Sequence, residues 1–344
     1  MNLRGKKISN CGEPFIIAEI GCNYDGNIEI AKKLILKAKE IGCDCAKFQS
    51  FDKDSLFTKS FYDNNAGDLP GETLAETLDR LTLTNSEIDD LISFCKKVDI
   101  GFASTPVSNV FVDTLASRDV EFIKIASFDL TNLPLLKYAA SKGKPIILSV
   151  GLGTLQEIEE AVDAIFSTGN KDLALLHCSA AYPPKDEYIN LRNIRLLRDY
   201  FGLPIGYSDH SKGYSVCLAA IAQGACIIEK HFTLDNTNET GDHPISANPE
   251  EMKIIVTEGK RIYTALGQYK RIISEQDEEY KNMLRRSVCT IKEFKKGDKI
   301  TADALTFKRP GTGIQIHEVP YILNRTVKKD ISADELLAWE DLEQ

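Results

Sequence analysis

Residues 204–232 read PIGYSDHSKGYSVCLAAIAQGACIIEKHF, in which two short apolar runs flank a stretch with helical spacing of apolar residues. The first run ends in His210, and the second contains His231 near its end. Because the whole chain has only five histidines, two at equivalent positions of successive runs form a candidate site. Two parallel strands joined by a helix would place both imidazoles on one rim of a sheet, where α/β proteins bind metals and substrates.

The same strand–helix unit recurs along the chain as far as residue 266. The expected strands cover residues 15–21, 45–50, 101–105, 122–127, 145–151, 173–179, 204–210 and 225–232. Helical spacing recurs between them and in a last segment, 249–266. Eight such alternations predict an α/β fold, the (β/α)₈ TIM barrel. An open doubly wound sheet is the alternative, although the turn EIGCNYDGN after the first strand lacks the GxGxxG pattern common in that fold.

One connection and the C-terminal region depart from this pattern. The segment 52–81 is long for a βα loop and has little periodicity, so it is either a loop that closes over substrate or a surface insertion. We expect a barrel domain over residues 1–268, a charged linker or helix over 269–285, and a small C-terminal domain over 286–344. A domain of that size has a marginal core, so packing against its own barrel or a partner's would stabilise it.

Composition narrows the function classes. The net charge of −9 argues against nonspecific binding to nucleic acid. No apolar run approaches the roughly 18 residues of a membrane span, and the N-terminus lacks the pattern of a signal peptide. The nine cysteines are scattered, as expected of reduced thiols. We therefore expect a cytoplasmic protein.

The C-terminal ends of the expected strands carry polar side chains that would face one pocket. They include Glu19, Lys47, Gln49, Thr105, Lys124, Ser127, Ser149, His177, Ser208, Asp209, His210, Glu229, Lys230 and His231. Lys47 and Lys124 interrupt apolar strands, and a buried ammonium needs a partner. They could bind a phosphate or carboxylate, pair with Glu19 or Glu229 inside the barrel, or act as Schiff-base lysines.

The two histidines suit a divalent cation whose shell is completed by oxygen ligands. Two protein ligands are too few for a structural zinc site, so Mn²⁺ or Mg²⁺ in an open, partly hydrated site is the natural choice. The alternative is a pair of hydrogen-bonded rim histidines that bind no metal.

Ordered motifs along nearly the whole chain resemble those of bacterial sialic acid synthases, the family that makes N-acetylneuraminate, legionaminate and pseudaminate. The motifs are FIIAEIGCNYDGN, AKFQSF, FASTP, KIASFDL, KPIILSVG, LLHCSAAYP, GYSDHS, EKHFTLD and TGDHPISANPEE. RRSV and KRPGTGI, in the C-terminal unit, resemble the SAF (antifreeze-like) domain of these enzymes. The resemblance implies a transferase that condenses phosphoenolpyruvate with an open-chain N-acylated mannosamine-type sugar and releases phosphate. The N-acetylneuraminate type is expected, and N,N'-diacetyllegionaminate or pseudaminate synthesis is the alternative.

The resemblance also implies roles for individual residues. The implied catalytic residues are Glu19, Lys47, Lys124, His210 and His231, of which the histidines match metal ligands. The implied phosphoenolpyruvate-binding residues are Lys47, Thr105, Lys124, Ser127, Ser149 and Ser208. The implied acceptor-binding residues are Gln49, Tyr182, Asp242 and Arg309, the last delivered by the neighbouring subunit of a domain-swapped homodimer.

The chain departs from the common family pattern at a few positions. Tyr24 replaces a frequent histidine, and Ala180 replaces an asparagine near the donor. Ala126 and Asp129 favour the pseudaminate branch, whereas KRPGTGI disfavours it. More distant alternatives are a Schiff-base aldolase or lyase acting on a sugar acid, and a non-catalytic binding or coat protein.

Overall fold

The computed structural model describes residues 1–343 and divides into two compact units. The first unit covers Met1–Gly267, and the second begins at Gln268.

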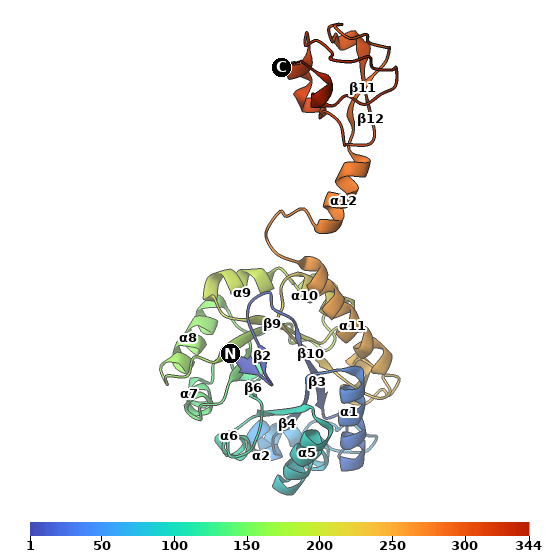
Figure 1. Cartoon of the computed structure of the whole chain (residues 1–344). Helices are drawn as coiled ribbons and strands as arrows, with labels where there is room; N and C mark the ends of the chain where they lie inside the picture. Colours follow the sequence, from blue (N-terminus) through green and yellow to red (C-terminus); the bar gives the residue numbers. More distant parts are fainter. Residues whose placement is uncertain (344) are drawn as a thin grey trace. The chain divides into compact units, whose positions relative to one another are not determined.

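The first unit is a closed barrel of eight parallel strands, as predicted (Figure 1). The strands are β3 (Phe15–Gly21), β4 (Cys45–Ser50), β5 (Gly101–Pro106), β6 (Ile123–Ile125), β7 (Ile146–Ser149), β8 (Leu173–Cys178), β9 (Ile205–Asp209) and β10 (Ile227–His231). Pairing of β10 with β3 closes the sheet, so the alternative of an open doubly wound sheet is wrong.

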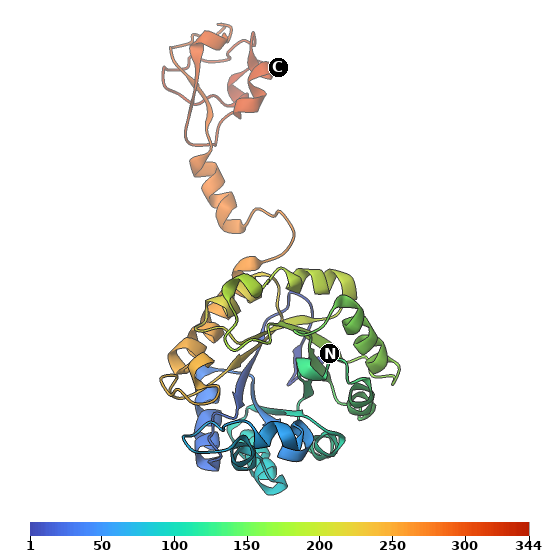
Figure 2. The ribbon, with the colours of Figure 1, turned by 180° about the vertical axis from the view of Figure 1, so that it is seen from behind.

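Helices surround the strands, and Figure 2 shows the same ring from behind. They are α1 (Ile28–Ile41), α5 (Asn85–Val98), α6 (Asn109–Ala116), α7 (Leu133–Ser141), α8 (Leu155–Phe166), α9 (Asn193–Phe201), α10 (Ser215–Ala222) and α11 (Pro249–Leu266). Local sequence sets several of their ends. Thr84, Thr154 and Asn248 form capping boxes at the starts of α5, α8 and α11. Gly42 ends α1 in the left-handed conformation that glycine adopts without strain.

The apolar core lies in two places, and this distribution leaves one end of the barrel for polar chemistry. The larger cluster packs the outer face of the strands against the helices. A second cluster fills the N-terminal end of the barrel, where Leu3 and Ile8 pack on Phe15 and Phe122. A hairpin of β1 (Asn2–Leu3) and β2 (Lys6–Lys7) covers that end. The polar strand ends therefore gather at the opposite, C-terminal end.

Several strands are shorter than the sequence predicts, among them β7 and β10, and two segments fold differently from the expectation. Strand β6 is shorter than the predicted 122–127, because Ser127–Asp129 turns into a short 3₁₀ helix. The segment 52–81 contains three short helices, α2 (Lys53–Leu56), α3 (Lys59–Asp63) and α4 (Leu74–Leu81), and a small core of its own that includes Leu78 and Leu81. Whether this segment closes over substrate stays a prediction.

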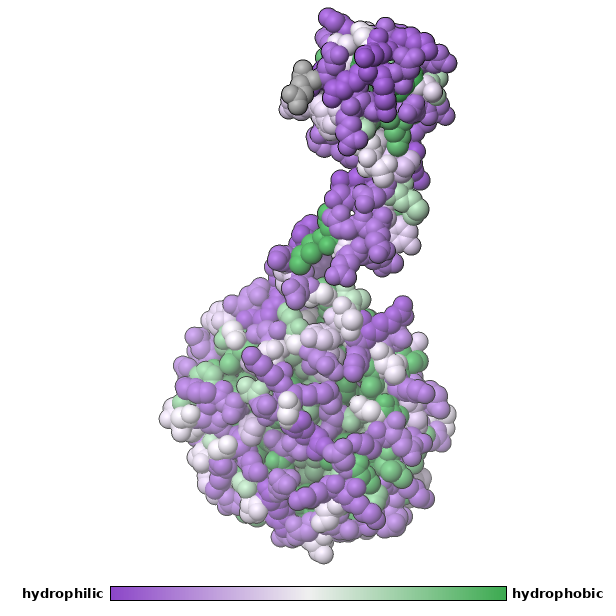
Figure 3. All heavy atoms as spheres, viewed as in Figure 1, coloured by the Kyte–Doolittle hydropathy of each residue, from purple (hydrophilic) through white to green (hydrophobic). Residues whose placement is uncertain are grey.

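The second unit begins with helix α12 (Glu275–Leu284), within the stretch predicted as a linker or helix. Strands β11 (Ser287–Thr290) and β12 (Leu305–Lys308) pair antiparallel and, with the short helix α13 (Val319–Ile322), enclose a core that includes Val288, Ile300 and Leu337. Hydrophilic residues cover most of the face seen in Figure 3. Among the described residues, no helix has the length and hydropathy needed to span a membrane.

Candidate active site

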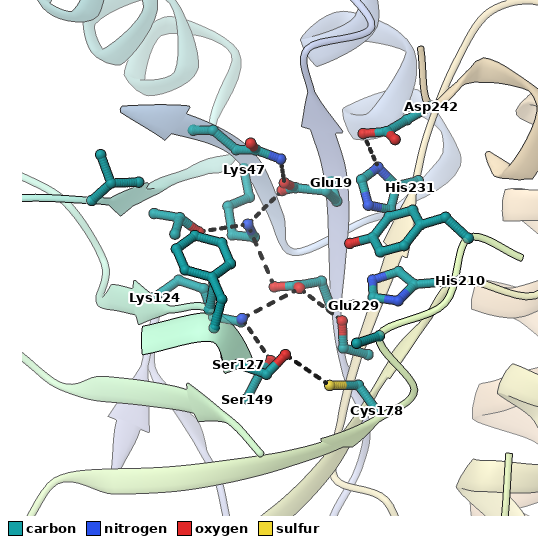
Figure 4. A pocket seen from close by; sticks show the side chains of 18 of the residues that line it. Glu19, Lys47, Lys124, Ser127, Ser149, Cys178, His210, Glu229, His231 and Asp242 are labelled. Carbon is teal, nitrogen blue, oxygen red and sulfur yellow. Dashed lines mark hydrogen bonds and ion pairs between the residues drawn. The ribbon is translucent and has the colours of Figure 1, made fainter. Parts of the chain in front are cut away.

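A cavity of about 480 Å³ opens at the C-terminal end of the barrel (Figure 4). Its lining includes every residue to which the resemblance assigns a role, except Arg309: Glu19, Lys47, Gln49, Thr105, Lys124, Ser127, Ser149, Tyr182, Ser208, His210, His231 and Asp242. The expectation that His177, Asp209 and Lys230 also face this pocket is wrong, because each lies next to an inward-pointing strand residue and so points outward. Alternation along the strands explains the convergence, because every second residue of a strand points inward. In β10, for example, Glu229 and His231 line the cavity, whereas Lys230 between them does not.

Two lysines and two glutamates form the floor of the cavity. The Nζ of Lys47 lies 2.7 Å from Glu19 Oε2 and 3.7 Å from Glu229 Oε2, and it donates to Thr105 Oγ1 at 3.1 Å. The Nζ of Lys124 lies 3.6 Å from Glu229 Oε1 and donates to Ser149 Oγ at 2.7 Å. Both lysines therefore pair with glutamates inside the barrel, one of the three roles that the sequence leaves open. Because the groups also line the cavity, the pairs are open to exchange with an anionic ligand.

The two floor carboxylates have opposite pKa shifts. Burial raises the pKa of Glu19 to about 7, with Glu229 adding to the effect and Lys47 opposing it. Burial also acts on Glu229, but attraction to Lys124 and Lys47 outweighs it and lowers the pKa of Glu229 to about 2. Glu229 therefore carries the negative charge, while Glu19 exchanges a proton near neutral pH.

The side of the cavity formed by β8, β9 and β10 is polar, and we call its residues Tyr182, His210, His231 and Asp242 the histidine wall. The Nδ1 of His210 lies 2.6 Å from the Ser179 carbonyl oxygen, which only accepts, so Nδ1 donates and Nε2 keeps its lone pair. The Nδ1 of His231 lies 3.5 Å from Asp242 Oδ2. The two imidazole centroids are 5.5 Å apart, and the Tyr182 ring stacks on His210 at 3.9 Å.

This wall fits a divalent cation with an open coordination shell. Burial, followed by repulsion between the imidazoles, lowers the pKa of His210 to about 4, and burial together with Lys47 lowers the pKa of His231 to about 3. Both rings are thus neutral at pH 7, which is the form that binds metal. Within residues 1–343, no group of three or more His, Cys, Asp or Glu side chains is arranged to hold a metal ion. A cation there would take its remaining ligands from water or substrate.

The side of the cavity that follows β4 to β7 is apolar, and sequence reasoning missed it. We call Leu56, Phe57, Val107, Phe128 and Leu152 the apolar wall. Phe128 is 57% exposed and Leu152 is 61% exposed, which is unusual for such large apolar side chains. The sequence does carry a signal for Phe128 and Leu152: each closely follows the end of an expected strand, and those ends face the cavity.

Glu229 and Arg309 stand apart from the other predicted residues. The sequence places Glu229 at a strand end but gives it no functional role beyond pairing with a lysine. Arg309 follows β12 in the second unit and is exposed there. Its contact with a neighbouring subunit stays a prediction.

Comparisons with known proteins agree with the sequence-based resemblance. A model of the NeuB family matches residues 34–271, and a model of the SAF domain matches residues 285–343. An uncharacterized protein of Methanocaldococcus jannaschii is 39% identical, covering 98% of this chain and 97% of its own length. The N,N'-diacetyllegionaminic acid synthase of Legionella pneumophila is 37% identical over 96% of this chain and 94% of its own.

A solved structure supports the same relationship. The N-acetylneuraminic acid (sialic acid) synthetase of Leptospira borgpetersenii serovar Hardjo-bovis superposes with a TM-score of 0.75 at 35% identity, covering 83% of this chain and 96% of that chain. This chain and the Leptospira protein are thus similar in both fold and sequence.

Proposed function

The chain belongs to the NeuB family and carries a C-terminal SAF domain, and from this premise we propose that it condenses phosphoenolpyruvate with an N-acylated mannosamine-type sugar in a reaction assisted by Mn²⁺ or Mg²⁺. The products are a nonulosonic (sialic-type) acid and inorganic phosphate. One observation carries the proposal: a floor of two lysines lies in the same cavity as a pair of neutral histidines.

The floor suits the anionic donor. Lys47 and Lys124 would exchange part of their attraction to Glu19 and Glu229 for the carboxylate and phosphate of phosphoenolpyruvate. The hydroxyls of Thr105, Ser127, Ser149 and Ser208 line the same cavity and would donate further hydrogen bonds. Donor charge is then neutralised by groups that are already in place, which lowers the cost of reorganisation during the reaction.

The histidine wall suits the acceptor aldehyde. A divalent cation on His210 and His231 would supply Lewis-acid polarisation of the aldehyde oxygen. Asp242 and Tyr182 would orient the sugar on that wall, and Gln49, which donates to Glu19 Oε1 at 3.3 Å, would contact it from β4. In the proposed dimer, Arg309 of the second subunit contacts the N-acyl group, a role that rests on the family resemblance.

With the donor on the floor and the acceptor on the histidine wall, the proposed condensation proceeds through the following bond changes. C3 of the enol attacks the aldehyde carbon, which forms the new C–C bond, and a water adds to the cationic C2. Glu19 is the candidate to take the proton of that water, because its pKa of about 7 allows exchange at neutral pH. That proton balances the one taken up by the former aldehyde oxygen, which becomes a hydroxyl. The tetrahedral carbon then collapses to the ketone: its C–O bond to phosphate breaks, and its hydroxyl proton leaves with the phosphate.

The apolar wall bears on which acceptor reacts. Its side chains offer no hydrogen-bond partner for sugar hydroxyls, so a face carrying methyl groups would bind there better. This favours a 2,4-diacetamido-trideoxymannose acceptor, as used in N,N'-diacetyllegionaminate synthesis, over the N-acetylmannosamine expected from the sequence.

The test is a phosphate-release assay with phosphoenolpyruvate and Mn²⁺ across a panel of acceptors. The panel contains N-acetylmannosamine, the 2,4-diacetamido-trideoxymannose, the corresponding altrose, and plain mannose. We expect release only with N-acylated manno sugars, fastest with the diacetamido sugar, and none after chelation of the metal. Borohydride trapping of a lysine with a keto acid, together with metal-independent turnover, would overturn the proposal in favour of a Schiff-base aldolase.

A further inference from the structure

A fully buried ion pair lies behind the histidine wall, outside the cavity. Lys230 Nζ and Asp209 Oδ2 are 2.9 Å apart, and neither side chain is exposed to solvent. The two residues face each other in the register of β10 and β9. Cys217 of α10 donates to Asp209 Oδ2 at 3.3 Å, which places the pair between the barrel wall and that helix.

Each member of the pair is the chain neighbour of one wall histidine. Asp209 precedes His210, and Lys230 precedes His231. The pair also holds the residue that follows His210: Asp209 Oδ1 accepts from the Ser211 amide at 3.0 Å, and Lys230 Nζ donates to the Ser211 carbonyl oxygen. The backbone on both sides of His210 is thereby fixed to the end of the neighbouring strand.

Stability alone does not account for such a pair. Removing two charges from water is costly, and replacing a buried ion pair with apolar side chains of similar size is often neutral or stabilising. The Tyr207 hydroxyl also donates to Asp209 Oδ1, at 3.1 Å. The orientation of the Asp209 carboxylate is therefore fixed, in addition to its charge being neutralised by Lys230. A network of this kind gives a defined geometry to the groups it holds.

We propose that Asp209 and Lys230 are positioning residues that set the separation and orientation of His210 and His231 for a divalent cation. The inference rests on the metal-assisted part of the proposed function. Neither residue contacts the cavity, so their effect reaches it through the backbone at residues 209–211 and through the register of β9 and β10. Groups that orient metal ligands from behind typically change metal affinity by about 10–100-fold when they are removed.

The test compares metal affinity with stability in matched variants. Asp209→Val combined with Lys230→Met removes both charges together, so that no unpaired buried charge remains. Leu136→Ala, at a fully buried position of α7 away from β9 and β10, destabilises the core and leaves the network intact. Binding of Mn²⁺ is measured by the electron paramagnetic resonance signal of the free ion, and unfolding by urea titration.

We expect the double variant to be folded and to bind Mn²⁺ about 10–100-fold more weakly than the wild type. Leu136→Ala should bind within about twofold of the wild type although it unfolds at lower urea. If the double variant fails to fold, Asp209→Asn, which keeps the side-chain shape, should still weaken binding by about 10-fold. Wild-type Mn²⁺ affinity in a folded network variant, or an equal loss in Leu136→Ala, would overturn the inference. Absence of Mn²⁺ binding by the wild type would instead count against the metal in the proposed function.

Discussion

The histidine wall and the apolar wall border the same cavity but are built in different ways. Both histidines come from strand ends: His210 Nδ1 lies 2.6 Å from the Ser179 carbonyl oxygen, and His231 Nδ1 lies 3.5 Å from Asp242 but makes no hydrogen bond among the described residues. Phe57, Phe128 and Leu152 come from loops and short turns beyond the strands and are 38%, 57% and 61% exposed. Reaction chemistry needs fixed positions, whereas substrate preference is commonly set by loops on a rigid scaffold. We therefore expect variants of the two walls to change different kinetic parameters.

The largest effect is expected from His231→Ala. Loss of one of the two candidate metal ligands should reduce phosphate release by about 10³-fold and leave the fold intact, because the removed ring points into the cavity. The matched control is His177→Gln, which changes a third rim histidine that bonds the Ile189 carbonyl oxygen and does not line the cavity. Equal losses in both variants would remove the distinction between the wall histidines and other buried histidines.

A large effect is also expected at the floor, from Lys124→Met. This change leaves Glu229 with a single lysine partner, Lys47, in a buried site. The Michaelis constant for phosphoenolpyruvate should rise by about 10²-fold, and the free energy of unfolding should fall by about 3 kcal/mol. Steady-state kinetics and urea unfolding measure the two effects. Lys142→Met, at a partly buried lysine that pairs with Asp113 outside the cavity, should change neither quantity.

The contrast between the walls also explains what the sequence could predict. Position at the C-terminal ends of the expected strands located Lys47, His210 and His231, because those ends gather at one end of a barrel. The apolar wall was missed because Phe128 lies in a 3₁₀ turn and Leu152 in a loop, whose conformations depend on tertiary packing. The hairpin β1–β2 gave no periodic signal, because a strand of two residues is too short for an alternating pattern to repeat.

The pairing of Asp209 with Lys230 illustrates a different limit. Both residues were recognised at strand ends and expected to face the pocket, but both point away from it. Their partnership depends on the register between β9 and β10, which the sequence of each strand does not specify by itself.

An intermediate effect is expected in the pH dependence of stability. Burial raises the pKa of Glu19 to about 7 from 4.5, so the folded state favours the protonated carboxyl. That contribution is complete below pH 4.5 and is lost as the pH rises to about 7. Relative to Glu19→Gln, the wild type should therefore lose about 2 kcal/mol of unfolding free energy between pH 5 and pH 8.

Urea unfolding at the two pH values measures this difference. The matched control is Glu72→Gln, because hydrogen bonds from Arg80 lower the pKa of Glu72 to about 2, outside the window. Its stability difference from the wild type should be constant from pH 5 to pH 8. A constant difference for Glu19→Gln as well would show that the floor carboxylate does not exchange a proton in that range.

The smallest effect is expected from Phe128→Ala in the apolar wall. Because Phe128 is 57% exposed, its removal should leave the unfolding transition unchanged. Loss of its contact with a methyl-bearing sugar should raise the Michaelis constant for the diacetamido acceptor by about fivefold, which corresponds to about 1 kcal/mol. The constant for phosphoenolpyruvate should stay the same, since the proposed donor site is the floor. Val110→Ala, at an exposed apolar residue outside the cavity, controls for a general surface effect. Equal changes for the diacetamido sugar and N-acetylmannosamine would mean that this wall does not discriminate between acceptors.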